Sequence, residues 1–494
     1  MNYKNIIIPK EISKVTQVIE EAGFEAYLVG GCVRDLFLGQ KAKDWDVTTN
    51  ATPEEIQALF PHTFYENKFG TVGIVNEEEG IDETLKVVEA TPYRIEGIYS
   101  NNRHPDEVSF STNLSDDLKR RDFTINAIAV REKKEGIEVV DLFDGKTDLK
   151  LKLIKTVGDP HLRFNEDGLR IMRAIRLAVQ LDFEIDEVTE KAIFECGSLL
   201  QNISAERLRD EFSKMLNTSD PMRAILMLKK LNLLQYIIPE LEEGVGCTQN
   251  KAHSFDVFEH LLRSLKHAAD KNYPFEIRLS ALLHDIGKPA TRRFSEEKKE
   301  YTFYGHEVVG ARMTKKILDR LKFPKDTIDK VTKLVRWHMF FSDTEQITLS
   351  AVRRMIVNVG KENIWDLMDV RICDRIGTGR PKEAPFRLRK YHSMIEEALR
   401  DPVSVGQLKV NGTILMEKLA VPPSPALGFI LHALLEEVLE EPEKNTEEYL
   451  LERSKELLKL PLTQLKELGL KGKAKKEKAD EEEVQKIRKN HNVK

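Results

Sequence analysis

The pattern of apolar residues changes at about Arg163, and this change constrains the fold of the 494-residue chain more than any other feature. Before this point, short apolar runs such as Ala26–Val29 alternate with segments of helical spacing. After it, apolar residues recur at helical spacing to about Leu399. Short runs bounded by turn residues are typical of strands, and longer periodic segments are typical of helices. We therefore expect an α+β fold, with strands and helices mixed at the N-terminal end and helices in the remainder.

The composition is that of a soluble globular protein, and it excludes several other classes. Lysine and arginine (77) nearly balance aspartate and glutamate (82), and 41% of the residues are hydrophobic. A disordered chain would contain less apolar material, and a membrane span would need about 20 consecutive apolar residues. The four cysteines are scattered, which indicates reduced thiols and a cytoplasmic protein without a signal peptide. The near-neutral charge still allows nucleic-acid binding through local patches.

A glycine turn provides the first candidate binding feature. Gly30 and Gly31 follow the apolar run 26–29 and precede a helical segment that contains Arg34. Glycine allows backbone N–H groups to approach a phosphate closely, and the start of a helix favours anions. A glycine turn alone is common, so this interpretation depends on the residues that follow.

A pair of aspartates strengthens that interpretation. Asp44 and Asp46 lie two residues apart in a segment of strand composition, so their carboxylates share one face. Neighbouring carboxylates repel unless a cation lies between them, and Mg²⁺ prefers oxygen ligands that it shares with phosphates. Glu89, in a second strand-like run, is the best-placed third carboxylate. We expect phosphoryl-transfer chemistry here, with these three residues as the catalytic groups.

Two further segments carry polar side chains suited to a nucleotide. Arginine side chains such as those of Arg120 and Arg121 can bind phosphates with two parallel hydrogen bonds. Asp122 and Asn126 are four apart, so one helix face could present both to a ribose hydroxyl. The alternative is an ordinary salt-bridged start of a helix.

The spacing of Asp167 and Arg170 predicts that both lie on one helix face. A carboxylate accepts and a guanidinium donates hydrogen bonds, an order that suits the pairing edges of cytosine and adenine but not those of uracil and guanine. Arg173 and Arg176 continue this face and could reach phosphates, although a solvated basic stripe is the simpler interpretation of Arg176.

Histidines and aspartates form a second constellation in the helical part. His284 and Asp285 are adjacent at the end of an apolar segment, which packing alone does not explain. Imidazole nitrogen together with carboxylate oxygen suits a divalent transition metal.

Five motifs in order resemble the class II tRNA nucleotidyltransferases, the family of CCA-adding enzymes and poly(A) polymerases. They are LVGGCVRD (28–35), DWDVTTNATPEE (44–55), RRDFTINAIA (120–129), DLFDG (141–145) and RFNEDGLRIMRAIRLA (163–178). The resemblance implies a catalytic head with a small mixed sheet over 1–150 and a helical neck with the base-selecting motif over 151–240. It also implies an HD-type metal-binding domain over 241–380 and a helical tail with a charged end over 381–494.

The resemblance also implies a function. The expected activity is template-independent addition of CCA to the 3′ end of tRNA from CTP and ATP, with Mg²⁺ at the head. The expected nucleotide-binding residues are Gly30, Gly31, Arg34, Arg120, Arg121, Asp122, Asn126, Asp167, Arg170, Arg173 and Arg176. In this family a flexible loop like that between Tyr93 and Phe110 accompanies addition of the terminal A. An A-adding enzyme and a poly(A) polymerase remain alternatives, and the oligomeric state is open.

The second constellation resembles the HD phosphohydrolases. His260, His284, Asp285 and Asp374 match the four basic ligands of that superfamily, and His306 and His338 match the additional histidines of variants that hold two metals. The resemblance implies phosphoesterase activity, which could repair damaged RNA ends before nucleotide addition. An HD phosphohydrolase whose head only binds RNA is the alternative from another functional class.

Overall fold

The computed structural model describes residues 6–65, 70–77, 80–96, 108–250, 254–339, 347–401 and 404–468. The chain forms two compact units, Met1–Ile237 and Ile238–Lys494. Most of the loop expected between Tyr93 and Phe110 and the charged end beyond residue 468 lie outside the described residues.

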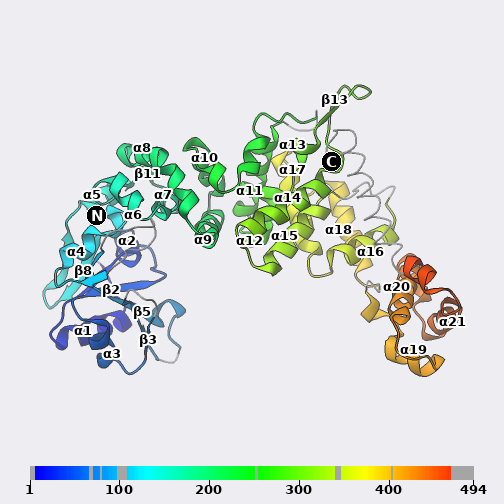
Figure 1. Ribbon diagram of the computed structural model, residues 1–494, viewed down its shortest axis with the longest axis horizontal. Helices are drawn as coiled ribbons and strands as arrows, with labels where there is room; N and C mark the ends of the chain where they lie inside the picture. Colours follow the sequence, from blue (N-terminus) through cyan, green and yellow to red (C-terminus); the bar gives the residue numbers. More distant parts are fainter. Residues whose placement is uncertain are drawn as a thin grey trace. The chain divides into compact units, whose positions relative to one another are not determined.

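Seven strands form one mixed sheet in the first unit (Figure 1). Two of these strands, β2 and β5, are parallel neighbours, whereas the other adjacent pairs are antiparallel. Every residue of β1 is buried, which is typical of a central strand. The order across the sheet is β3 (Thr63–Tyr65), β4 (Val72–Val75), β5 (Val87–Pro92), β2 (Trp45–Thr49), β1 (Ala26–Val29), β8 (Ile128–Lys133) and β9 (Gly136–Asp141).

Short helices complete the head. Thr52 begins α3 with a reciprocal cap, since its side chain accepts from the Glu55 amide and the Glu55 side chain accepts from the Thr52 amide. The elements of the head beside the sheet are α1 (Lys10–Glu21), α2 (Gly31–Phe37), α3 (Pro53–Leu59), the hairpin β6 (Arg94–Glu96) and β7 (Val108–Phe110), α4 (Leu114–Lys119) and α5 (Gly145–Leu151).

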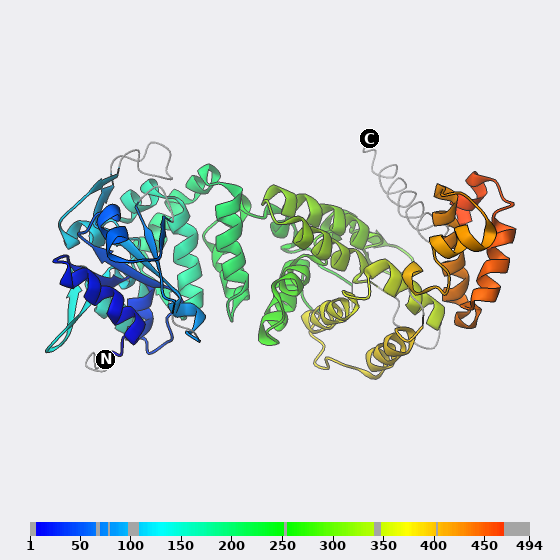
Figure 2. The same ribbon diagram turned by 90° about the horizontal axis from the view of Figure 1, so that it is seen from below.

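Helices follow the head within the first unit, and Figure 2 shows them in cyan to green next to the sheet. They are α6 (Pro160–Glu166), α7 (Leu169–Leu181), α8 (Glu187–Cys196), α9 (Ala205–Leu216) and α10 (Pro221–Lys230). Two short strands, β10 (Leu153–Ile154) before α6 and β11 (Glu184–Ile185) after α7, pair with each other in parallel. α7 lies at its centre, and nine of its residues are buried.

Within its described residues, the second unit is helical apart from one hairpin. Its helices are α11 (Val257–Asp270), α12 (Phe275–Leu283), α13 (Lys288–Thr291), α14 (His306–Arg320), α15 (Lys325–Trp337), α16 (Leu349–Val359), α17 (Ile364–Gly377), α18 (Phe386–Ala398), α19 (Gly412–Leu419), α20 (Pro425–Glu440) and α21 (Glu447–Leu457). The antiparallel hairpin consists of β12 (Arg293–Ser295) and β13 (Glu300–Thr302). The described 3₁₀ helices of both units are η2 (Glu83–Leu85), η3 (Thr124–Asn126), η4 (Gly197–Asn202), η5 (Leu234–Tyr236), η6 (Pro239–Gly244), η7 (Val405–Gln407) and η8 (Pro442–Lys444).

One cluster of buried apolar residues runs through the second unit. It begins with Ile277 on α12 and Leu334 on α15 and continues through Tyr391 on α18 to Leu434 on α20 and Leu465. The cluster therefore extends across residue 380, where the sequence suggests a domain boundary.

The expected α+β class is confirmed, with a mixed sheet in the head and a helical remainder. Two small sheets depart from the helical pattern after Arg163. β11 pairs with β10, which precedes α6, and β12–β13 is a local hairpin within the second unit. Strands of two or three residues are too short for periodicity to distinguish them from loops.

Candidate functional site

The three predicted catalytic carboxylates lie in or next to the neighbouring strands β2 and β5. Asp46 and Glu89 are register partners in the parallel strands β2 and β5, so their side chains leave the sheet side by side on one face. Both are half-buried, whereas Asp44 is exposed and immediately precedes β2. The structure thus brings a carboxylate from a second strand next to the Asp44-x-Asp46 pair.

The glycine turn lies directly against these carboxylates. Gly30 has a φ of 78°, in the region that favours glycine. A Cβ atom added to Gly30 would lie 2.9 Å from Oδ2 of Asp46 and 3.4 Å from Nη1 of Arg121. Any side chain at position 30 would therefore press on a candidate metal ligand.

A chain of hydrogen bonds connects four of the predicted nucleotide-binding residues. Arg34 donates to Oδ1 of Asn126 at 3.0 Å, and Asn126 donates to Oδ1 of Asp122 at 3.2 Å. Arg173 donates to Oδ2 of Asp122 at 2.8 Å. Burial alone would raise the pKa of Asp122, but the charge and hydrogen bond of Arg173, the charge of Arg170 and the hydrogen bond from Asn126 together outweigh it and lower the pKa to about 2. These groups form one partly buried polar network, in which Arg34 and Asn126 are buried and Asp122 and Arg173 are half-buried.

The expectation that Asp122 and Asn126 share a helix face is wrong. Asn126 ends the 3₁₀ helix η3, and Asp122 precedes that helix in an irregular segment. The two side chains nevertheless meet, because Asp122 and Asn126 are hydrogen-bonded to each other directly.

Asp117 is a member of this region that the motif analysis missed. Its buried carboxylate accepts from Nε of Arg120 at 2.9 Å and from Nη2 of Arg121 at 3.0 Å. Burial would raise the pKa of Asp117, but the charges of Arg121 and Arg120 outweigh it and hold the pKa below its ordinary value. The spacing of three and four residues from Asp117 to the arginines was the available signal.

The Asp167 and Arg170 pair differs from the expected arrangement on one helix. Asp167 has an extended backbone between α6 and α7, so only Arg170 lies on α7. The Asp167 carboxylate accepts from the Leu169 amide at 3.1 Å and from Arg207 at 2.6 Å. Arg170 donates to Glu166 at 2.5 Å and to the Arg120 carbonyl at 2.9 Å. Both groups are therefore held in place by neighbours.

The last two predicted arginines are paired with Glu211 of α9, a buried carboxylate. Nε of Arg176 donates to Oε2 of Glu211 at 2.6 Å, and Nη1 of Arg173 lies 4.0 Å from Oε1. The contacts of Arg176 connect α7 to α9. The structure thus places Arg173 in the polar network around Asp122. It places Arg176 in the contact between α7 and α9.

The second unit gathers the predicted metal ligands into two buried groups that share Asp285. In the first group, Nε2 of His260 lies 3.0 Å from Oδ2 of Asp285 and 3.3 Å from Oδ1 of Asp374, and Nε2 of His284 lies 3.3 Å and 3.6 Å from the same atoms. In the second group, Nε2 of His306 and of His338 lie 3.1 Å and 3.4 Å from Oδ1 of Asp285. Each oxygen of Asp285 thus faces a different group.

The histidine rings are oriented so that Nε2 faces the carboxylates. Nδ1 of His284, His306 and His338 lies 2.7–2.9 Å from a backbone carbonyl. A ring nitrogen held by a carbonyl fixes the tautomer and leaves the other nitrogen as a ligand. Burial lowers the pKa of His338 to about 4, which keeps this ring neutral at pH 7. The donor set therefore fits divalent metal ions.

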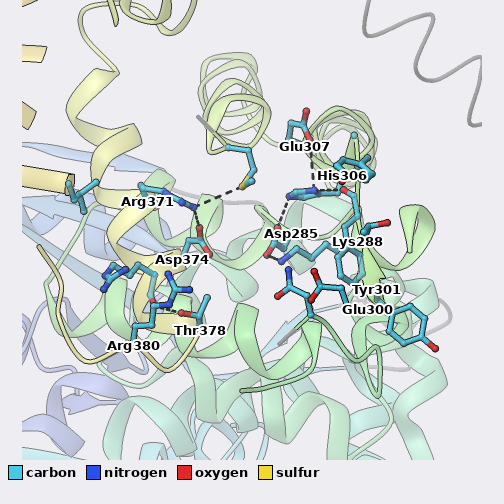
Figure 3. A pocket seen from close by; sticks show the side chains of 18 of the residues that line it. Asp285, Lys288, Glu300, Tyr301, His306, Glu307, Arg371, Asp374, Thr378 and Arg380 are labelled. Atoms are coloured by element: carbon cyan, nitrogen blue, oxygen red, sulfur yellow. Dashed lines mark hydrogen bonds and ion pairs between the residues drawn. The ribbon is translucent and has the colours of Figure 1, made fainter. Parts of the chain in front are cut away.

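A cavity of about 920 Å³ opens onto both ligand groups, and Asp285, His306 and Asp374 contribute to its wall. Figure 3 shows Arg371 and Arg380 on the side of Asp374, and Tyr301 and Lys288 on the side of His306. Lys288 lies 2.6 Å from Oδ2 of Asp285, and Arg371 pairs with Asp374. Burial would raise the pKa of Asp285, but the charges of Lys288 and His284 outweigh it and hold the pKa well below its ordinary value.

Sequence reasoning did not find the rest of this wall. The hairpin β12–β13 contributes Tyr301, and the segment after α17 contributes Arg380. Burial, and to a smaller extent the like charges of Arg380 and Arg371, lower the pKa of Arg375. The spacing of Arg371 and Arg375 around Asp374 was the only local signal.

Among the helices of the described residues, none is both long enough and apolar enough to cross a membrane.

Family models match three consecutive parts of the chain: the poly(A) polymerase head domain over residues 26–155, a probable RNA-binding region of polymerase A over 182–244, and the HD domain over 253–377. The chain is 48% identical over 231 residues to a CCA-adding enzyme of Limosilactobacillus reuteri, covering 47% of this chain and 55% of the relative. This alignment, like several similar ones, spans about half the length of the relative.

An A-adding tRNA nucleotidyltransferase of Deinococcus radiodurans is 32% identical over 421 residues, covering 83% of this chain and 91% of the relative. A crystal structure of the Bacillus stearothermophilus CCA-adding enzyme with CTP superimposes with a TM-score of 0.65 at 26% identity, covering 92% of this chain and all of that one. A Thermotoga maritima CCA-adding enzyme with tRNA has the same fold at 21% identity and a TM-score of 0.54, covering 92% of this chain and 97% of that one. The motifs of the head, the carboxylates of β2 and β5 and these relatives together show that the chain belongs to the class II tRNA nucleotidyltransferase family and carries an HD domain.

Proposed function

We propose that this protein is a nucleotidyltransferase that adds CCA to the 3′ end of tRNA, using CTP and ATP and releasing pyrophosphate. The observation that carries the proposal is the position of Glu89 beside Asp46, with Asp44 two residues earlier. The relatives matched over the head, which are named CCA-adding enzymes, support the same conclusion.

In this proposal the 3′-hydroxyl oxygen of the RNA bonds to the α-phosphorus of the nucleotide, and the bond from that phosphorus to pyrophosphate breaks. Asp44, Asp46 and Glu89 would hold Mg²⁺, which when bound would favour loss of the hydroxyl proton to water and neutralise charge on the leaving pyrophosphate. Gly31, Arg34 and Arg121 would hold the triphosphate, since the two guanidinium groups lie around the glycine turn.

The base would be selected by Asp167 and Arg170. The carboxylate accepts a hydrogen bond from the amino group shared by cytosine and adenine, and the guanidinium donates to the adjacent ring nitrogen. Arg207 and Glu166 hold the two side chains, so a base with the opposite order of donors would leave buried polar groups unpaired.

The extent of addition separates the main alternatives. The relative that aligns over most of the chain is named an A-adding enzyme, so addition of A alone is the second candidate. The test is addition to a tRNA transcript lacking its 3′ CCA, offered CTP alone, ATP alone and then both with Mg²⁺.

Addition of two C residues from CTP, followed by one A and a stop with both nucleotides, is the expected result. Addition of A only to a tRNA that already ends in CC would instead identify an A-adding enzyme. A long A tail would identify a poly(A) polymerase. Transfer that survives Asp44→Ala would contradict the catalytic assignment.

We also propose that the second unit hydrolyses phosphate esters at RNA ends, because two buried ligand groups share Asp285 at the base of an open cavity. His260, His284, Asp285 and Asp374 would hold one divalent transition metal ion, and His306 and His338 would hold a second with Asp285. Metal bound there would supply a water of lowered pKa and polarise the phosphoryl oxygens. Lys288 and Arg371 line the wall where the phosphate would lie.

Phosphatase assays with Mn²⁺ or Ni²⁺ test this second activity. Asp285→Asn should abolish hydrolysis and leave nucleotide addition intact, whereas Asp44→Ala should have the opposite effect. Nucleotide addition that is absent in the unchanged protein while hydrolysis is present would favour the alternative of an HD phosphohydrolase with an RNA-binding head.

A further inference from the structure

Three arginines line the HD cavity without a carboxylate of their own. Arg375, Arg380 and Arg387, here called the arginine cluster, line the same cavity as Asp374. Nε of Arg375 donates to the Lys382 carbonyl at 2.7 Å. Within the part of the chain that the structure describes, none of the three forms an ion pair with an acidic side chain, and Arg380 and Arg387 are exposed.

The cluster differs in this respect from the cations nearest the metal ligands. Arg371 is paired with Asp374, and Lys288 is paired with Asp285. The charges of Arg371 and Lys288 are therefore partly neutralised by carboxylates of the protein. The positive charges of the arginine cluster can instead be neutralised by a bound anion. Arginine binds phosphate through two parallel hydrogen bonds, so a phosphate is the anion that such a group fits best.

Exposed aromatic side chains line the same cavity. Tyr304 follows the hairpin β12–β13 and is 64% exposed, and Phe386 begins α18 and is 69% exposed. The Tyr304 hydroxyl accepts from Lys298 at 2.8 Å. Aromatic faces next to cations are the surfaces on which nucleic-acid bases stack. The cavity thus combines places for phosphates with places for a base.

We propose that the HD cavity takes a nucleotide with two phosphate groups, one at the metal-ligand groups and a second, uncleaved one at the arginine cluster. This proposal rests on the phosphohydrolase function proposed above for the same site. In the reaction, a water oxygen bonds to the phosphorus of the first phosphate, the bond from that phosphorus to the leaving oxygen breaks, and the leaving oxygen takes the proton. The leaving oxygen belongs to the ribose in a 3′-phosphate and to the adjacent phosphate in a 5′-diphosphate or 5′-triphosphate. The second phosphate contributes binding only.

Two kinds of molecule could provide the two phosphate groups. In an RNA 3′ end, the second phosphate is the phosphodiester that precedes a 3′-terminal phosphate. In a free nucleotide, it belongs to a 5′-diphosphate or 5′-triphosphate. Adenosine 3′,5′-bisphosphate imitates the first source, and ADP and ATP represent the second.

The kinetic test compares adenosine 3′,5′-bisphosphate with adenosine 3′-monophosphate as substrates of the full chain with Mn²⁺. We expect kcat/KM to be about tenfold or more higher for the bisphosphate, because hydrogen bonds to charged groups are strong. Arg380→Ala combined with Arg387→Ala should remove this preference and leave hydrolysis of the monophosphate unchanged. Arg389→Ala combined with Lys390→Ala, exposed on α18 but outside the cavity wall, is the matched control.

A binding measurement gives a readout independent of hydrolysis. Calorimetry in the presence of a chelator should detect binding of adenosine 3′,5′-bisphosphate to the unchanged protein. The affinity should fall about tenfold or more in the Arg380 and Arg387 double variant and stay unchanged in the control variant. Equal kcat/KM for the two substrates, or equal binding to all three proteins, would overturn the inference and leave the proposed hydrolase intact. If neither substrate is hydrolysed, the proposed hydrolase fails, and calorimetry alone decides whether the arginine cluster binds a second phosphate. Higher kcat/KM for ADP or ATP than for the bisphosphate would assign the second phosphate to a free nucleotide.

Discussion

Glu89 lies directly beside Asp46 in the adjacent parallel strands β5 and β2. This register brings together carboxylates from distant parts of the sequence, and the rest of the head surrounds them with arginines and a glycine turn. It also makes the role of Glu89 open to direct measurement.

Glu89→Gln removes one negative charge from the three carboxylates without changing the size of the side chain. Because loss of a metal ligand costs several kcal/mol of transition-state stabilisation, the rate of nucleotide addition should fall about 100-fold or more. Single-turnover addition of CMP to tRNA measures this rate. Glu135→Gln, at the exposed turn between β8 and β9, is the control, and an equal effect of both changes would remove Glu89 from the catalytic set.

Gly30→Ala tests whether the turn must stay clear of Asp46. A positive φ costs a non-glycine residue about 1–2 kcal/mol, and the added Cβ would also press on Oδ2 of Asp46. Gly39→Ala is also at a positive φ, of 67°, but its Cβ would meet open space. Urea unfolding measures the loss of stability in each variant, and only Gly30→Ala should lose nucleotide addition. Equal activity of both variants would contradict the proposed crowding.

Asp122 should make part of the stability depend on pH. Its pKa is lowered from 3.8 to about 2 in the folded protein, so the ionised form stabilises the fold by about 2 kcal/mol. A lowered pKa means that this stabilisation is complete above about pH 4 and disappears as the pH falls toward 2. The difference in unfolding free energy between the protein and Asp122→Asn should therefore shrink on acidification. A difference that is constant between about pH 6 and 3 would be incompatible with the Arg173 pairing.

The shared position of Asp285 predicts how metal content responds to substitution. His306→Ala should remove one of two bound metal equivalents, whereas Asp285→Asn should weaken binding of both, because each oxygen of Asp285 faces a different group. Elemental analysis after dialysis against limiting Mn²⁺ measures the content. His267→Gln, on the same helix as His260 but outside both groups, should bind as much metal as the unchanged protein. Loss of both metals in His306→Ala would mean that the second group does not bind independently.

Local sequence patterns predicted the parts of the site that depend on spacing. β2 places Asp46 beside Glu89, and the adjacent His284 and Asp285 belong to one ligand group, as neighbouring residues can predict. Asp44 lies just before β2 and not in it, so the expected alternation along one strand covers only Asp46. The place of Asp167 could not be predicted in this way. Its extended backbone interrupts two helices whose apolar spacing continues across the gap, so periodicity suggests one helix where the chain forms two.

The arginine cluster illustrates a second limit. Arg375 belongs to α17, whereas Arg380 follows its end and Arg387 lies on α18. These residues line one cavity but come from three separate segments. No regular spacing in the sequence therefore indicates that they belong to the same site. The same holds for the short hairpin β12–β13 on the opposite side.

The apolar cluster that extends from Ile277 to Leu465 has a consequence for how the second unit holds together. The metal ligands end at Asp374, but the helices that carry them share their interior with α18, α20 and α21. Shortening the chain after residue 380 would remove Tyr391, Leu434 and Leu465 from this shared cluster and expose apolar surface on the helices that remain. The C-terminal helices thus contribute to the interior of the unit although they carry none of the metal ligands, and their loss would have to be offset by another apolar surface.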